Sequence, residues 1–133
     1  MPPEVSRETR EALERFAALL LRWSHTVNLI SRSDELHLWT RHIDDSLQLL
    51  PLMQPLPSRA IDLGSGAGFP GLVLALASGV HFDLIEADQR KCAFLREAAR
   101  VTGAPVRIYP VQRRPNSRGR SVIYRLIRSG SLC

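Results

Sequence analysis

The chain has 133 residues, enough for one modest domain, and its hydrophobic content of 44% is typical of a globular protein. It contains no apolar run near the ~18 residues that a membrane-spanning helix needs, and its start lacks the pattern of a secretory leader. Cys92 and Cys133 have neither metal-ligand spacing nor the pattern of a disulfide framework. We therefore expect a cytoplasmic protein with no membrane segment and no metal site.

The basic charge of the chain is concentrated at its end. The net charge is +5, yet residues 107–133 contain seven arginines and no acid, whereas residues 1–106 carry a net charge of −2. A basic composition of the whole domain, as expected of many nucleic-acid-binding proteins, is therefore absent from most of the sequence.

The N-terminal part predicts two amphipathic helices. Residues 7–22 have apolar side chains at helical spacing. A second helix is expected over residues 35–50, with Ser33 or Asp34 as its N-cap. Its predicted apolar face consists of Trp39, Ile43, Leu47 and Leu50. The proline-rich residues 51–57 then predict a linker.

From residue 60 onward the pattern alternates between strands and helices. Short apolar runs predict strands near residues 60–63, 81–86 and 105–109, and the segments between them predict helices near residues 69–78 and 89–102. This alternation is typical of an α/β fold with a parallel, doubly wound sheet, in which three strands alone leave an apolar sheet edge uncovered.

A glycine-rich turn between the first predicted strand and helix is the strongest functional signal. Asp62 lies near the end of the strand and is followed by glycines at 64, 66, 68 and 71. Glycines allow a ligand to approach the backbone, and the helix that follows offers free N–H groups. Twenty residues after Gly66 comes Glu86, at the end of the second strand, where a carboxylate can accept hydrogen bonds from both hydroxyls of a ribose. The sequence therefore predicts a nucleotide-like cofactor.

Three interpretations of the turn remain open. The order Asp-x-Gly-x-Gly from Asp62 is typical of S-adenosylmethionine (SAM) sites, where the acid acts on the cationic methionine end. Gly66 to Gly71 also matches the dinucleotide pattern G-x-G-x-x-G, although Asp62 would then repel a diphosphate. The third interpretation is a turn without a ligand, with Asp62 as its capping carboxylate. We favour SAM, with these candidate cofactor residues: Asp62, Gly64, Ser65, Gly66, Gly68, Phe69 and Glu86.

The chain resembles the bacterial small-subunit ribosomal RNA guanine-N7 methyltransferases, once called glucose-inhibited division protein B. The matching segments occur in the family's order over roughly residues 10–110: Trp23-x-x-x-x-Asn28-Leu29, Arg41-His42-Ile43-x-Asp45-Ser46, the glycine motif of residues 62–71, Glu86, and Arg90-Lys91-x-x-Phe94-Leu95-Arg96.

This resemblance implies a class I SAM-dependent methyltransferase (Rossmann-like) fold, here incomplete, with an N-terminal helical region. It implies methyl transfer from SAM to N7 of a guanine in 16S ribosomal RNA or the small ribosomal subunit. Guanine N7 is already a nucleophile, so orientation matters more than proton transfer, and we assign no catalytic residue. By the same resemblance, Arg41, His42, Arg90 and Lys91 are candidate contacts to the RNA substrate.

We therefore expect three parts: an N-terminal helical region (1–57), the first half of a SAM-binding domain (58–111) and a divergent, Arg-rich tail (112–133). The resemblance is expected to end near Val111, and a frameshifted or otherwise altered end would explain the tail. Such a truncated chain, a monomer if it folds, is expected to bind SAM weakly and to transfer no methyl group. The alternative function is a non-catalytic RNA-binding variant that acts through the tail.

Overall fold

The computed structural model describes residues 3–111 and 127–128. A long helix, α1 (Arg7–Trp23), is followed by four short helical segments: α2 (Arg32–Glu35), the π-helical turn η1 (Trp39–Ile43), α3 (Asp44–Leu47) and the 3-10 turn η2 (Leu50–Met53). The α/β part then runs β1 (Arg59–Leu63), α4 (Gly71–Ser78), β2 (His81–Glu86), α5 (Gln89–Thr102) and β3 (Val106–Pro110), and the last described element is β4 (Ile127–Arg128).

The sheet has the strand order β3-β2-β1-β4, with β1, β2 and β3 parallel. The predicted α/β alternation is thus confirmed, and the fold is that of a class I methyltransferase. The expected open edge is partly wrong, because β4 pairs antiparallel with β1 at Ala60 and Ile61. A short strand or turn of helix that the sequence permits over residues 121–126 would lie outside the described residues.

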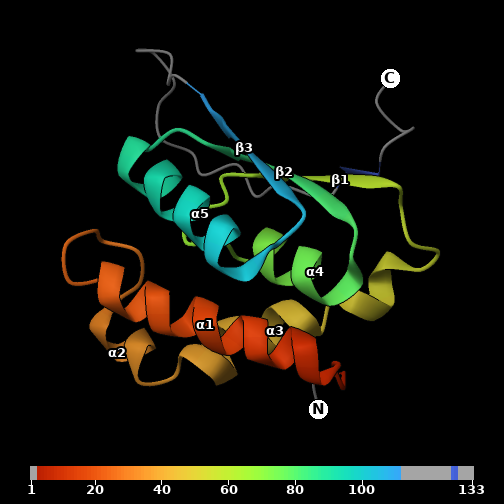
Figure 1. Cartoon of the computed structure of the whole chain (residues 1–133), viewed down its shortest axis with the longest axis horizontal. Helices are drawn as coiled ribbons and strands as arrows, with labels where there is room; N and C mark the ends of the chain where they lie inside the picture. Colours follow the sequence, from red (N-terminus) through yellow and green to blue (C-terminus); the bar gives the residue numbers. More distant parts are fainter. Residues whose placement is uncertain (1–2, 112–126, 129–133) are drawn as a thin grey trace.

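Both crossover helices cover the same face of the sheet. Figure 1 shows α4 and α5 side by side beneath the strands, with α1 on the far side of the two helices. This arrangement follows from the topology, because successive right-handed crossovers in one direction place their helices on one side. In the described part of the chain no helix lies against the other face, so the expectation of helices on both faces is not met there.

The core lies between this sheet face, α4, α5 and α1. Its largest fully buried side chains include Phe16 of α1, Phe82 of β2 and Phe94 of α5. The predicted helix over residues 7–22 is confirmed, with Ser6 as its N-cap. Cys92 is buried, as expected for a small core residue.

The predicted continuous helix over residues 35–50 is wrong. The N-cap is Ser31, whose hydroxyl accepts from the Asp34 N–H at 3.1 Å, and the helical segment breaks after Glu35. At η1 the Asp44 N–H donates to the Trp39 carbonyl, a π-type bond across five residues. That wider turn allows Leu38 and Ile43, five residues apart, both to be buried, which a regular α-helix does not favour.

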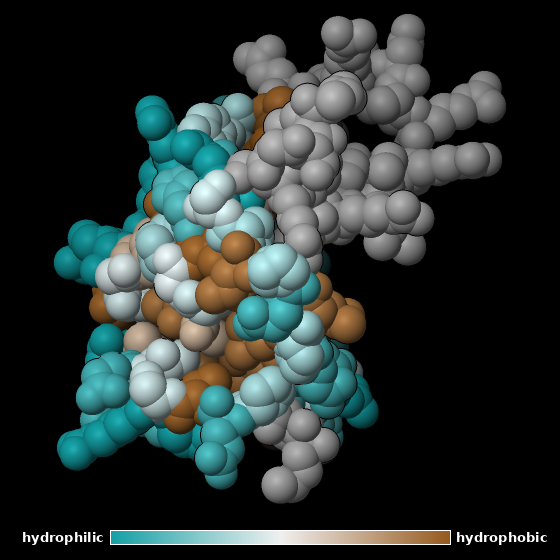
Figure 2. All heavy atoms as spheres, turned by 90° about the vertical axis from the view of Figure 1, so that its right-hand side faces the viewer, coloured by the Kyte–Doolittle hydropathy of each residue, from teal (hydrophilic) through white to brown (hydrophobic). Residues whose placement is uncertain are grey.

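The surface at the right-hand side of Figure 1 includes apolar groups. The segment between α3 and β1 exposes 75% of Leu52 and 47% of Leu56. Figure 2, which views the molecule from that side, shows apolar and polar residues interleaved there. Met53 in the same segment is buried, so the expected linker contributes to the core.

Candidate functional site: the glycine turn

The glycine turn lies at the carboxyl ends of β1 and β2. Leu63 pairs with Ile85 at the end of the two strands, and the Gly64 N–H donates to the Ile85 carbonyl at 2.8 Å. In open α/β sheets this edge is where ligands bind. The topology therefore brings the two predicted acids, Asp62 and Glu86, to the same edge.

Asp62 is buried beneath the turn. The residue is 5% exposed, and its Oδ2 accepts from the Gly71 N–H, at the start of α4, at 2.9 Å. A Cβ at Gly71 would lie 2.5 Å from that oxygen and 2.6 Å from a methyl group of Leu84, so the approach requires glycine. Burial raises the pKa of Asp62 to about 6, against the opposing effect of the Gly71 N–H. Asp62 is thus a buried carboxylate with no cationic partner among the described residues.

Glu86 connects the glycine turn to the start of α5. One carboxylate oxygen accepts from the Gly66 N–H at 2.9 Å and the other from the Asp88 N–H at 2.8 Å. Each oxygen has a second lone pair, so the carboxylate retains the capacity to accept two more hydrogen bonds. This is the capacity that the two hydroxyls of a ribose require.

The remaining turn residues divide between packed positions and backbone groups without a hydrogen-bond partner among the described residues. The Ser65 hydroxyl is buried and donates to the Asp62 carbonyl at 3.1 Å, and Gly68 has φ of +97° with Phe16 and Leu72 closely packed beside it. The N–H groups of Ala67 and Phe69 have no acceptor in the part of the chain that the structure describes, and a Cβ at Gly66 would have only the Gly64 carbonyl oxygen within 4 Å, at 3.9 Å. A cofactor that needs hydrogen-bond donors and close backbone approach fits these residues.

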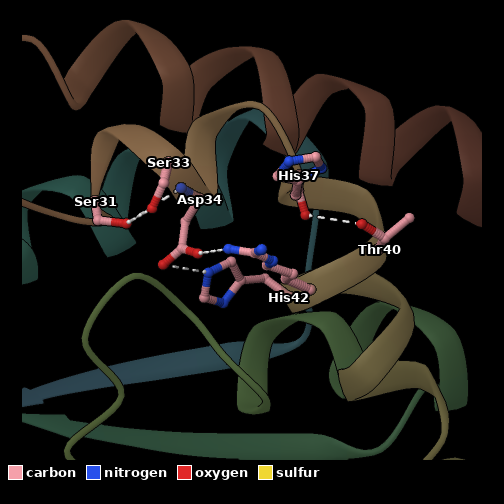
Figure 3. A network of polar contacts seen from close by, with 7 residues as sticks. Ser31, Ser33, Asp34, His37, Thr40 and His42 are labelled. Carbon is pink, nitrogen blue, oxygen red and sulfur yellow. Dashed lines mark hydrogen bonds and ion pairs between the residues drawn. The ribbon is translucent and has the colours of Figure 1, made fainter.

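The predicted substrate residues Arg41 and His42 lie close to the turn. The His42 ring stacks on Phe69 with centroids 5.0 Å apart and ring planes 29° apart. The Asp34 carboxylate contacts both residues, with one oxygen 3.2 Å from Arg41 Nη1 and the other 3.3 Å from His42 Nε2 (Figure 3). The structure therefore joins the N-terminal helical region to the glycine turn.

Arg90 and Lys91 are in the first turn of α5, shortly after Glu86. Their N–H groups donate to the side chain of Asp88, the N-cap of α5, at 2.9 and 3.1 Å. Arg90 is exposed and Lys91 half-buried, so both reach solvent beside the turn.

Two features of the site do not follow from the sequence pattern as interpreted above. The sequence pattern predicts Asp34 only as a helix cap, and its contact with Arg41 depends on the break between α2 and η1. Gly71 belongs to the glycine motif, but its packing against Asp62 depends on tertiary structure.

Two further findings concern the described residues as a whole. No helix among them is long and apolar enough to cross a membrane. Within residues 3–111 and 127–128, no group of His, Cys, Asp and Glu side chains could hold a metal ion.

Comparison with known proteins decides the family. The model of the family described as rRNA small subunit methyltransferase G matches residues 9–122. The chain belongs to this methyltransferase family. The match continues past Val111, the expected end of the resemblance.

Curated relatives agree with this assignment. A protein named ribosomal RNA small subunit methyltransferase G from Granulibacter bethesdensis is 61% identical over 105 residues, which cover 79% of this chain and 49% of the relative. The protein of the same name from Gluconobacter oxydans is 58% identical over 104 residues, covering 78% of this chain and 53% of the relative. That of Paramagnetospirillum magneticum is 53% identical over 104 residues, covering 78% and 51%. The chain thus spans about half the length of the curated relatives it matches.

Proposed function

We propose that the chain is the cofactor-binding part of an enzyme that transfers a methyl group from SAM to N7 of a guanine in 16S ribosomal RNA. The observation that carries the proposal is the pair of buried carboxylates at one sheet edge, Asp62 and Glu86, each bonded to the backbone of the glycine turn. Family membership and the names of the relatives support the reaction type and the RNA substrate.

Asp62 favours SAM over a dinucleotide. Its carboxylate accepts from Gly71 at the start of α4, where a dinucleotide-binding protein would place its diphosphate. An anion there would meet a buried negative charge, whereas the ammonium and sulfonium groups of SAM would be attracted to it. SAM supplies the methyl group on a positively charged sulfur, and the protein's task is to hold it in line with the guanine.

In this proposal each predicted residue has a defined role. Asp62 supplies negative charge for the methionine end, Glu86 accepts from the ribose hydroxyls, and the free N–H groups of Ala67 and Phe69 donate to the cofactor. Gly64, Ser65, Gly66 and Gly68 shape the turn. Arg41, His42, Arg90 and Lys91 contact the RNA on the solvent side of the turn.

Cofactor binding is tested by calorimetric titration of the 133-residue chain with S-adenosylhomocysteine (SAH) and, separately, with NADH. We expect measurable SAH binding, no NADH binding, and loss of SAH binding in Glu86→Ala. NADH binding without SAH binding would refute the proposal.

The RNA contact is tested by binding of unmethylated small ribosomal subunits at several salt concentrations. Removing one cation that binds a phosphate should reduce the slope of log affinity against log salt by about 1. We expect this reduction in Arg90→Ala and in Arg41→Ala, but not in Arg7→Ala, an exposed arginine at the start of α1 whose ion pair with Glu11 lies within that helix. Unchanged slopes in both site variants would contradict the assigned RNA contacts.

A further inference from the structure

Phe69 is the point at which the N-terminal helical region contacts the glycine turn. Its ring lies between two residues of that region: His42 stacks on it, and Phe16 of α1 meets it edge-on with centroids 5.5 Å apart and planes 66° apart. Because Phe69 follows Gly68 directly, the position of its ring constrains the backbone at the end of the turn. Whatever fixes the His42 ring therefore restrains the turn as well.

The position of the His42 ring depends on Asp34. Its Nε2 is shielded from solvent and makes no aligned hydrogen bond to the described part of the chain, and a carboxylate oxygen of Asp34 lies 3.3 Å away. An imidazolium, or a neutral ring protonated at Nε2, is attracted to a carboxylate at that distance. The stack on Phe69 is by itself a weak restraint on rotation about the Cα–Cβ and Cβ–Cγ bonds of His42, and such rotation would tilt the ring away from Phe69.

Asp34 is itself held in place from two directions. Its N–H donates to the Ser31 hydroxyl at the start of α2, and its second oxygen binds Arg41 at 3.2 Å (Figure 3). The Ser31 hydroxyl and then the Arg41 guanidinium hold the pKa of Asp34 below its ordinary value, so the side chain is ionised at neutral pH.

We propose that Asp34 is a positioning residue for the cofactor turn: it holds the His42 ring flat against Phe69, and Phe69 transmits that restraint to the turn. The inference rests on the proposed function, since the turn is the SAM site proposed above. Asp34 touches neither the cofactor nor the RNA in this scheme; it acts through His42.

The test is Asp34→Asn, which removes the charge and preserves the shape of the side chain. Glu35→Gln is the matched control, because Glu35 lies in the same short helix, undergoes the same change of charge and makes no ion pair with any described residue. The first measurement is the NMR ring-current shift of the His42 ring protons, which reports its stacking on Phe69. We expect Asp34→Asn to move this shift toward the value of a free histidine and Glu35→Gln to leave it unchanged.

The second measurement is SAH affinity by calorimetry. Asp34→Asn is expected to weaken binding by about two- to tenfold, with little change in Glu35→Gln. A double-mutant cycle with His42→Phe then separates positioning from a general structural role. Phenylalanine can stack on Phe69 but has no N–H group or charge that could interact with the Asp34 carboxylate. In that background Asp34→Asn should therefore change the SAH affinity by less than about twofold.

An unchanged ring-current shift in Asp34→Asn would overturn the inference, and so would an undiminished loss of affinity in the His42→Phe background. If the parent chain binds no SAH, the proposed function fails, whereas the ring-current shift still decides whether Asp34 holds the His42 ring.

Discussion

Asp62 and Asp83 are buried aspartates on neighbouring parallel strands, but their environments are opposite. Asp62 of β1 faces the helices. Among the described residues, the Gly71 N–H is the one backbone donor to its carboxylate. Asp83 of β2 faces the other side of the sheet and binds Arg59 through both of its oxygens, each at 2.7 Å, with His81 3.0 Å from one of them.

The pKa values of the two carboxyl groups are shifted in opposite directions. Burial raises the pKa of Asp62 to about 6, whereas the Arg59 guanidinium holds the pKa of Asp83 below its ordinary value. A buried carboxylate already paired with a cation has its charge compensated within the fold. One that lacks a cation is costly to ionise, and that cost is recovered only when a cationic ligand arrives. Asp83 therefore contributes to stability, whereas Asp62 is available for binding.

The largest expected effect is on the pH dependence of stability. The folded chain retains the Asp62 proton between pH about 4 and 6, where the unfolded chain has released it, so unfolding free energy falls as pH rises through this window. Asp62→Asn should remove this loss. The difference in unfolding free energy between pH 7 and pH 4 should therefore be more favourable in the variant than in the parent chain, by up to about 3 kcal/mol. Urea unfolding at the two pH values measures it.

Asp83→Asn is the opposing control. The lowered pKa of Asp83 contributes stability above its ordinary pKa, which is lost as pH falls through the folded-state value, so this variant should lose stability at pH 7 more than at pH 3. If both variants shift the pH profile in the same direction, the proposed distinction between the two aspartates is wrong.

The next largest effect is expected from Glu86→Gln. The glutamine amide has one acceptor oxygen for two backbone N–H groups, so either Gly66 or Asp88 loses its acceptor, at about 1–3 kcal/mol. Both urea stability and SAH affinity should fall. Glu97→Gln, which alters only an exposed ion pair with Arg100, should change neither by much, and a similar loss there would show that the effect is one of charge alone.

Much of this site could be predicted from the sequence because its signals are local. The strand, glycine turn and helix occupy consecutive residues, and parallel topology brings Asp62 and Glu86 to one edge once the alternation is recognised. The contact between Arg59 and Asp83 could not be predicted in this way, since it depends on the register of β1 against β2 across 24 residues.

The irregular helical segments could not be predicted from the sequence pattern either. Ser31, Ser33 and Asp34 are all good N-caps, and periodicity does not choose among them. The π-helical turn η1 accompanies the burial of both Leu38 and Ile43 in the core, a tertiary effect. The contact of Asp34 with residues 41 and 42 follows from that turn.

The Arg-rich tail as an RNA-binding segment stays a prediction. Residues 112–126 and 129–133, which contain most of its arginines, lie outside the described part of the chain.

A smaller effect is expected on the pH dependence of SAM binding. If Asp62 attracts the cofactor as proposed, protonation of its carboxylate removes that charge, so affinity should fall as pH drops below about 6, by at most tenfold per pH unit. Calorimetry from pH 5 to 8 measures this, with Asp83→Asn retaining the dependence and Asp62→Asn losing it. A persistent slope in Asp62→Asn would mean that another group controls binding.

The smallest effect on the cofactor is expected from Arg59→Leu. This variant removes the main partner of the buried Asp83, so the urea midpoint at pH 7 should fall. Arg59 begins β1 and Leu63 ends it, which places the substituted position about 13 Å along the strand from the start of the glycine turn at the usual rise per residue of a strand. Changes at that separation with no shared contacts are usually additive, so SAH affinity of the folded fraction should change by less than about twofold. If SAH affinity fell together with stability, the glycine turn and the Arg59–Asp83 pair would form one cooperative unit. The distinction between Asp62 as a binding residue and Asp83 as a stabilising residue would then be wrong.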